Sequence, residues 1–196
     1  MKQVVFLLMG LGLLSGCAVT TEQITLHYEP QKNVAKIEKA DSVTVDVVVK
    51  DDRPDMSRVS RKKNGFGMEM ASITATEDVT VTISKAIEQE LIQRGFKVEK
   101  PANVSIKAEL TRFYNDFKLG FFAGDAVADL NMSVDIYDKN HSSIYTRKVA
   151  VQGIEKNIQL MTGDNARLAL NDAIKNGLSL LFEDKTFIST LLATAR

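Results

Sequence analysis

Alternation of apolar and polar residues in three long stretches restricts the fold of this chain more than any other feature. The stretches cover residues 104–116, 127–137 and 142–152. A period of two places every second side chain on one face of a strand, so we expect a sheet with a buried face. Residues 138–141 are typical of a turn, so the second and third stretches should pair as an antiparallel hairpin.

Helical periods flank these strands. Residues 77–94 repeat apolar side chains every four positions and stop before Gly95, residues 164–182 carry one apolar stripe, and Asp184 opens a short terminal helix. Residues 42–50 form the clearest strand, because valine recurs at alternate positions. This order predicts an α+β fold, with two main helices on one face of a mostly antiparallel sheet of four to six strands.

The chain begins with a leader. Residues 1–16 hold one early lysine and then an apolar run of 11 residues, from Val4 to Leu14. A membrane span needs about 20 such residues. The run therefore predicts a secretory signal peptide, which takes no part in the fold.

The leader ends on the only cysteine of the chain. Leu14, Ser15 and Gly16, followed by Cys17, resemble the lipobox that a signal peptidase recognises in bacterial lipoproteins. That resemblance implies a thioether-linked diacylglycerol and an N-acyl chain on Cys17, and several acyl chains anchor a protein stably. Ala18 is not the aspartate that retains such proteins in the inner membrane, so we expect the periplasmic side of the outer membrane.

The remaining chain divides into two parts in this prediction. Residues 17–41 are expected to form the lipidated cysteine and a flexible tether, and residues 42–196 a single globular domain. Lys plus Arg and Asp plus Glu both number 25, and this zero net charge argues against binding to nucleic acid. With two histidines and one cysteine, we expect no metal site and no cofactor beyond the acyl chains.

The lipobox LLSGC, the strand sequence VTVDVVVKDDR and the helix ending LIQRGFKV resemble the YajG-like lipoprotein family of Gram-negative bacteria. The long hairpins and a terminal helix with a Phe-Ile pair extend the resemblance over nearly the whole chain. Members of that family are small outer-membrane lipoproteins of unknown molecular function. The resemblance therefore implies a fold and a location, and it names no activity.

Two sets of residues outside that pattern are candidate contacts for a partner or for anionic lipid: the basic Arg58, Arg61, Lys62 and Lys63, and the aromatic Phe121 and Phe122. A basic loop can bind phosphate groups, although a solvated hairpin has the same composition. An aromatic pair at a hairpin tip either packs into the core or stays exposed as a contact.

Catalytic motifs are weak. Asp51, Asp52 and Asp55 follow the first strand, where carboxylates can bind calcium or act as acid and base. Their spacing lacks the ligand pattern of a calcium loop and favours a strand-ending turn in which they pair with Arg53. The sequence holds no nucleophile elbow and no phosphate-binding glycine loop.

We therefore expect a non-enzymatic, lipid-anchored lipoprotein that serves the cell envelope as a binding or accessory module. Its expected partners are the membrane, through the anchor, and a protein of the envelope. The alternative is a periplasmic binder of lipid or cell-wall fragments, with its ligand in a groove between helices and sheet. The sequence leaves the oligomeric state open.

Overall fold

The computed structural model describes residues 20–120 and 123–194. The residues Leu14, Ser15 and Gly16 of the expected leader, the expected lipid-attachment residue Cys17, and the pair Phe121 and Phe122 lie outside the described residues. In chain order the elements are β1 (Glu22–Ile24), a 3-10 turn η2 (Ala40–Ser42), β2 (Thr44–Asp51), β3 (Ser60–Lys63), β4 (Glu69–Ala75), α2 (Val79–Gln93), β5 (Lys97–Val98), β6 (Val104–Leu119), β7 (Gly124–Asp138), β8 (Ser143–Ile158), α3 (Gly163–Phe182) and α4 (Lys185–Ala193).

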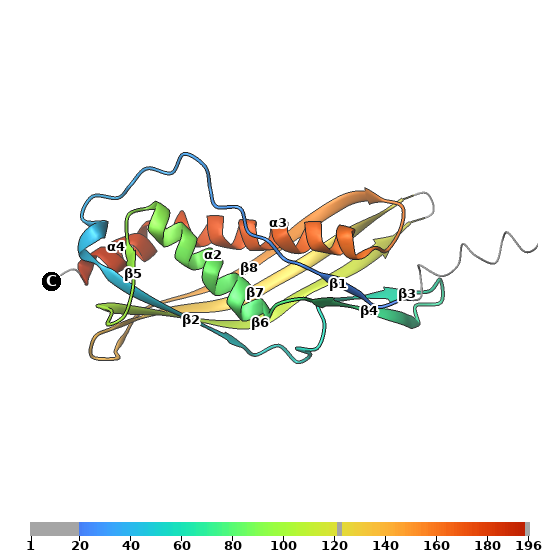
Figure 1. Ribbon diagram of the computed structural model, residues 1–196, viewed down its shortest axis with the longest axis horizontal. Coiled ribbons are helices and arrows are strands. Elements are labelled where there is room, and N and C mark those ends of the chain that lie inside the picture. The colour runs from blue at the N-terminus through green and yellow to red at the C-terminus, as the bar shows by residue number, and fades with distance from the viewer. Residues whose placement is uncertain (1–19, 121–122, 195–196) are drawn as a thin grey trace, which may run out of the picture.

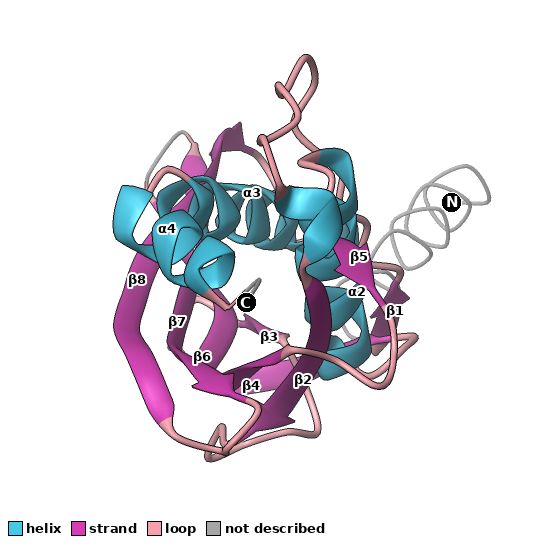
Figure 2. Ribbon diagram, turned by 90° about the vertical axis from the view of Figure 1, so that its left-hand side faces the viewer, coloured by secondary structure: helices cyan, strands magenta, loops and turns pink. Residues whose placement is uncertain are grey.

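The described strands form one eight-stranded mixed sheet (Figure 1). Viewed along the long axis, the sheet curves beneath the three α-helices (Figure 2). The overall α+β class is as predicted. The finer prediction of a mostly antiparallel sheet of four to six strands is wrong, because the sheet is mixed and has eight strands. Four strand pairs are parallel, namely β1 with β4, β2 with β5, β2 with β6 and β3 with β6.

Strand β6 explains why the sheet is mixed. Along one edge it pairs antiparallel with β7, and on the other edge it pairs parallel first with β2 and then with β3. The exchange occurs where β2 ends opposite Leu110 and β3 begins opposite Asn115. A register shift between Leu110 and Arg112 lies at the same place, and such bulges bend and twist a strand. Alternation carries no information on strand direction, so these parallel pairs were not predictable from the periodicity.

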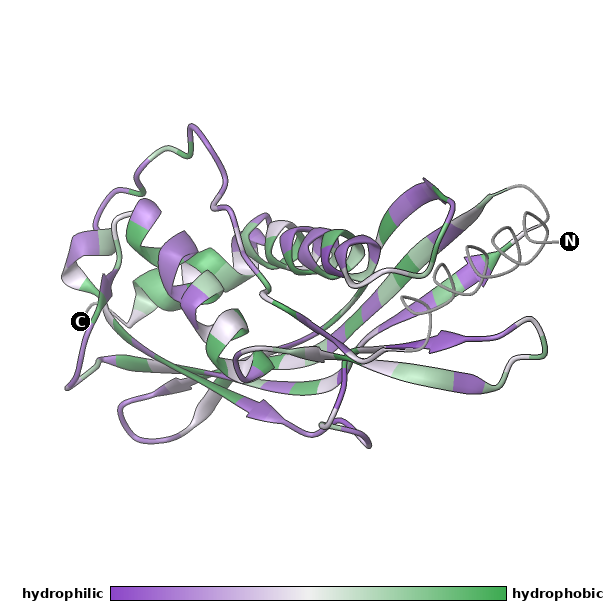
Figure 3. Ribbon diagram, turned by 45° about the vertical axis from the view of Figure 1, so that its right-hand side comes forward, coloured by the Kyte–Doolittle hydropathy of each residue, from purple (hydrophilic) through white to green (hydrophobic). Residues whose placement is uncertain are grey.

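The most periodic segments form the elements predicted for them. Strands β7 and β8 pair as an antiparallel hairpin, and green and purple bands alternate along the long strands in Figure 3. Asp138 shapes the hairpin turn, since its Oδ1 accepts bonds of 2.9 Å from the backbone N–H groups of Asn140 and Ser142. Helix α3 starts at Gly163, one residue before the expected position, and its cap is Thr162, whose hydroxyl accepts from the backbone N–H of Asn165. Helix α4 starts after Asp184, as expected.

Residues 20–41 pack against the helices and are not a flexible tether, so that part of the prediction is also wrong. Ile24 and Tyr28 are buried in the core. The Tyr28 hydroxyl donates to Glu90 Oε1 over 2.5 Å, and the backbone N–H of Gln31 donates to the same oxygen over 2.8 Å. Burial and the bond to Glu90 raise the pKa of Tyr28. Arg94 completes the cluster by binding the other Glu90 oxygen.

A second carboxylate fixes the start of the described chain. Glu22 on β1 accepts from the ammonium of Lys62 on β3 and from the backbone N–H of Gly163, the first residue of α3. A carboxylate at a helix N-terminus also interacts favourably with the helix dipole. Glu22 therefore joins β1, β3 and α3 at one end of the molecule.

Helix α3 lies unusually close to β8 at Gly153. A Cβ at this position would collide with the backbone carbonyl oxygen of Ala169 and the backbone nitrogen of Ala173. The alanines of α3 on this side are buried, which permits the close approach.

We expect Gly153→Ala to lower the free energy of unfolding by about 3 kcal/mol, because backbone atoms cannot yield to the added methyl group. Chemical denaturation followed by circular dichroism measures the change. The matched control is Gly65→Ala, where a Cβ meets nothing within 4 Å. Equal stability of the two variants would contradict the close packing of α3 on β8.

Candidate functional site

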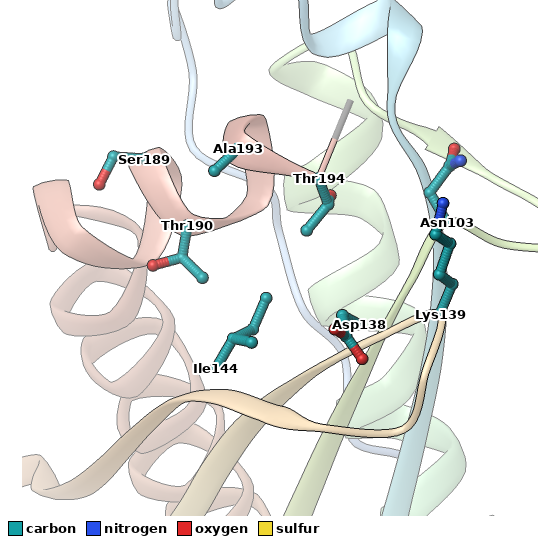
Figure 4. Close-up of a pocket in the computed structure, with 8 residues that line it drawn as sticks. All are labelled: Asn103, Asp138, Lys139, Ile144, Ser189, Thr190, Ala193 and Thr194. Atoms are coloured by element: carbon teal, nitrogen blue, oxygen red, sulfur yellow. The ribbon is translucent and has the colours of Figure 1, made fainter. Parts of the chain in front are cut away.

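A cleft opens between α4 and the sheet at the end of the molecule where β7 turns into β8 (Figure 4). Its volume is about 580 Å³. Figure 4 shows side chains from α4 on one side and from the β7–β8 hairpin and the loop before β6 on the other. The lining residues are Asn103, Asp138, Lys139, Ile144, Ser189, Thr190, Ala193 and Thr194.

Asp184 holds α4 in place as one wall of the cleft. Its Oδ1 accepts from the backbone N–H of Thr186 over 2.8 Å, which caps the helix. Its Oδ2 accepts from the hydroxyl of Tyr145 on β8 over 2.8 Å and from Arg147. Phe187 packs edge-on against Tyr145, with ring centroids 5.6 Å apart. Polar and aromatic contacts together therefore fix α4 to β8.

The same cluster shifts two pKa values. Burial alone would raise the pKa of Asp184, but the bonds from Tyr145, Thr186 and Arg147 outweigh it and hold that pKa below its usual value. Burial, and then the bond to Asp184, raise the pKa of Tyr145 to about 12. Asp184 is thus charged and Tyr145 neutral at physiological pH.

The lining of the cleft suits a polar ligand with hydroxyl groups. Thr190 offers a hydroxyl, Lys139 an ammonium, and Ile144 an apolar surface. The hydroxyls of Ser189 and Thr194 already donate to the backbone carbonyls of Thr186 and Leu191, so they offer a ligand only their lone pairs. Asp138 already serves the turn through its two backbone bonds. Within residues 20–120 and 123–194, no three His, Cys, Asp or Glu side chains come together as metal ligands.

A smaller groove of about 320 Å³ lies beside β6 and includes two of the predicted contact residues, Arg58 and Arg61. Arg58 pairs with Asp55 over 2.6 Å and also with Glu69. Arg61 lies 3.5 Å from the other Glu69 oxygen. Because carboxylates compensate both guanidinium groups, the groove is not a strongly basic patch.

The other predicted basic residues are also paired. Lys62 is buried on β3 and binds Glu22. Lys63 lies 3.3 Å from Asp116 on β6. The partners come from β1 and β6, which are remote in sequence, so the charge pattern of residues 58–63 alone gave no sign of them. The structure does not describe Phe121 and Phe122 and leaves the prediction for them untested.

The acidic segment after β2 forms a turn around Arg53. The Arg53 side chain is 5% exposed and binds Asp51 over 2.7 Å as well as the backbone carbonyl of Phe113 over 3.1 Å. Burial would raise the pKa of Asp51, but the Arg53 bonds prevail and lower it. Bonds from Ser57 and Arg58 lower the pKa of Asp55 to about 2. These carboxylates are thus engaged in local structure.

The cleft beside α4 had no distinct signal in the sequence. Its hydroxyl residues lie on a helix whose apolar stripe predicts only packing, and the turn that faces them is about fifty positions away in the chain. Among the helices in the described part of the chain, none has the length and hydropathy of a membrane span.

Comparison with known proteins adds a family. A family model described as "Uncharacterized lipoprotein" matches residues 30–191. The chain is 23% identical over 185 residues to the protein named "Uncharacterized lipoprotein YajG" of Escherichia coli K12, covering 88% of this chain and 90% of that one. The same protein of Escherichia coli O6:H1 matches equally well.

A crystal structure of a protein from Xanthomonas campestris has a similar fold. The TM-score is 0.61 at 12% identity, and the match covers 89% of this chain and 99% of the other. At that identity the likeness supports the fold alone.

We expect Tyr145→Phe to lower the free energy of unfolding by about 1 to 2 kcal/mol at pH 7, because the bond to the Asp184 carboxylate is lost. The folded pKa of about 12 exceeds the ordinary value of 10. The contribution of the Tyr145 hydroxyl to the free energy of unfolding is therefore complete below pH 10, and it disappears as the pH rises to about 12.

Denaturation curves of both proteins from pH 7 to pH 12 measure this effect, and the two stabilities should converge at the alkaline end. A gap that stays constant over this range would show that the hydroxyl is not held by Asp184.

Proposed function

The chain belongs to the family of uncharacterized lipoproteins, and from that premise we propose that acyl chains on Cys17 anchor it to the periplasmic side of the outer membrane. There it serves as a binding or accessory module of the envelope, with an envelope protein as partner and without catalysis. The proposal refines the family assignment, which gives a lipoprotein and no more specific role.

One observation carries the anchor. The only cysteine of the chain stands at the end of an apolar leader and three positions before Thr20, where the described structure begins. A thiol is the group that accepts diacylglycerol in lipoproteins. Two or more acyl chains hold a protein on a membrane without a spanning helix.

The state of the acidic groups supports binding over catalysis. The buried Glu90 is surrounded by Tyr28, Gln31 and Arg94, and Asp184 by Tyr145 and Arg147. Each of these carboxylates holds two or more elements together. A general acid or base needs a proton-transfer partner in the substrate, whereas these groups face other parts of the protein.

The cleft beside α4 favours a second candidate function, the binding of cell-wall fragments. It lies between a helix and the sheet, its volume of about 580 Å³ is in the range of small-ligand sites, and its lining hydroxyls match sugar hydroxyls. This function is compatible with the same anchor.

We expect the native chain, grown with radiolabelled palmitate, to incorporate the label and to fractionate with outer membranes. Cys17→Ala removes the thiol that accepts the lipid, so it should abolish both results. Cys17→Ser, which keeps a similar size, should behave as Cys17→Ala. Membrane association of either variant would contradict the anchor.

For the cleft, we expect solubilised cell-wall glycopeptides to bind with a signal in calorimetry. Thr190→Trp should abolish that signal because the large ring fills the cleft. Thr186→Trp on the same helix is the control, since Thr186 is exposed and does not line the cleft. Equal binding by both variants would place the ligand elsewhere.

A further inference from the structure

The distance between the anchor and the folded body is short. Thr20 lies against β3, where its carbonyl oxygen accepts from Lys62 over 3.3 Å. Three Cα–Cα steps separate Cys17 from Thr20 and span at most about 11 Å. If Cys17 carries lipid, as proposed above, the end of the body that holds Thr20 stays within that distance of the membrane surface.

Strand pairing identifies which end this is. β1 runs parallel to β4, with Glu22 opposite Ile73 and Ile24 opposite Ala75. Followed backwards from Glu22, the chain therefore heads toward the start of β4, where the β3–β4 hairpin has its tip. The end of β6, the start of β7 and the end of β8 lie at this same end, which is on the right in Figure 1. We name it the anchor end.

The hairpin tip at the anchor end presents an apolar side chain to solvent. Phe66 is 91% exposed, and Met68 is 59% exposed. The turn that carries them is well bonded, because Asn64 Oδ1 accepts from the backbone N–H groups of both residues over 3.0 Å. Gly67 has a φ of 82°, which suits glycine. The turn thus holds Phe66 away from the core.

Other exposed apolar residues gather at the same end. Leu119 at the end of β6 is 50% exposed, and Leu160, between β8 and α3, is 69% exposed. Among the described residues, the six most exposed large apolar side chains are those of Met56, Phe66, Met68, Ile92, Leu119 and Leu160, and four of them lie at the anchor end. Such a concentration at the β3–β4 turn, the end of β6 and the loop before α3 indicates a contact surface and exceeds the scatter of single residues found on ordinary surfaces.

The length of the β3–β4 hairpin indicates that this apolar surface contacts lipid. Strand β3 ends at Lys63, and Phe66 stands in the turn beyond it, so the tip lies at most about 13 Å past Lys62, the residue that binds Thr20. This is comparable with the longest span available between Cys17 and Thr20. A tip that projects as far as the linker can extend meets the membrane before a protein partner can fit between them.

From these observations we propose that the anchor end docks on the lipid surface, with Phe66 and Met68 entering the boundary between headgroups and acyl chains. The contact is mainly apolar, because Phe66 and Met68 form it, and the neighbouring Lys62 and Lys63 are paired with Glu22 and Asp116. It supplements the acyl anchor and sets the orientation of the body. The proposal rests on the lipid anchor of the proposed function.

The absence of tryptophan from the sequence provides the test. Full-length Phe66→Trp, lipidated in cells, is reconstituted into phosphatidylethanolamine–phosphatidylglycerol vesicles with plain or brominated acyl chains. Bromine quenches only a fluorophore that enters the lipid, so we expect brominated lipid to reduce the emission at least twofold. Met68→Trp should give the same result. Ile144→Trp, an exposed position at the opposite end, is the control and should lose less than a tenth.

Flotation of the vesicles separates the two proposals. If both variants float with the vesicles but Phe66→Trp is quenched no more than Ile144→Trp, the docking is overturned and the anchor stands. A blue-shifted emission of Phe66→Trp without quenching would indicate that a protein covers the residue, and it would overturn the docking on lipid. Equal quenching of the variants at both ends would overturn it too. If the lipidated protein does not float with the vesicles, the proposed lipid anchor is wrong, and the docking that rests on it is wrong as well.

Discussion

The carboxylates of Glu90 and Glu22 bind the N-terminal segment to the rest of the domain, and the arrangement of the chain depends on these contacts. Glu90 is fully buried, and the hydroxyl of Tyr28, the backbone of Gln31 and the guanidinium of Arg94 satisfy it. A buried charge with such a set of partners is tolerated, whereas an unpaired one is very costly. Glu22 makes a comparable junction among β1, β3 and α3. Residues 20–41 thereby become part of the domain.

Local patterns in the sequence predicted the elements that local physics determines. The β7–β8 hairpin has a strong turn and regular alternation, and α4 has its Asp184 cap, so both formed as expected. Parallel pairing was missed because alternation gives the buried face of a strand and not its direction. The packing of residues 20–41 was missed because it depends on partners far along the chain, such as Glu90, 62 positions after Tyr28.

The candidate contact residues illustrate the same limit. Arg58, Arg61 and Lys63 form a basic cluster in the sequence, yet Glu69 and Asp116 neutralise them in the fold. A charge run indicates a binding surface only when its partners in space are known. Conversely, nothing in the sequence of the glycine-rich turn around Phe66 indicates whether its side chain is buried, and the structure shows it almost wholly exposed.

The long strands also determine the distance between the α4 cleft and the anchor end. β8 has 16 residues and runs from the α4 cleft to the anchor end, a length of about 50 Å. If the body is anchored and docked as proposed, it would stand upright and hold the cleft at a constant height above its own bilayer. Lipids embedded in that bilayer would then be out of reach of the cleft. Its ligand would have to arrive from the aqueous layer or from the polymer that lies within it.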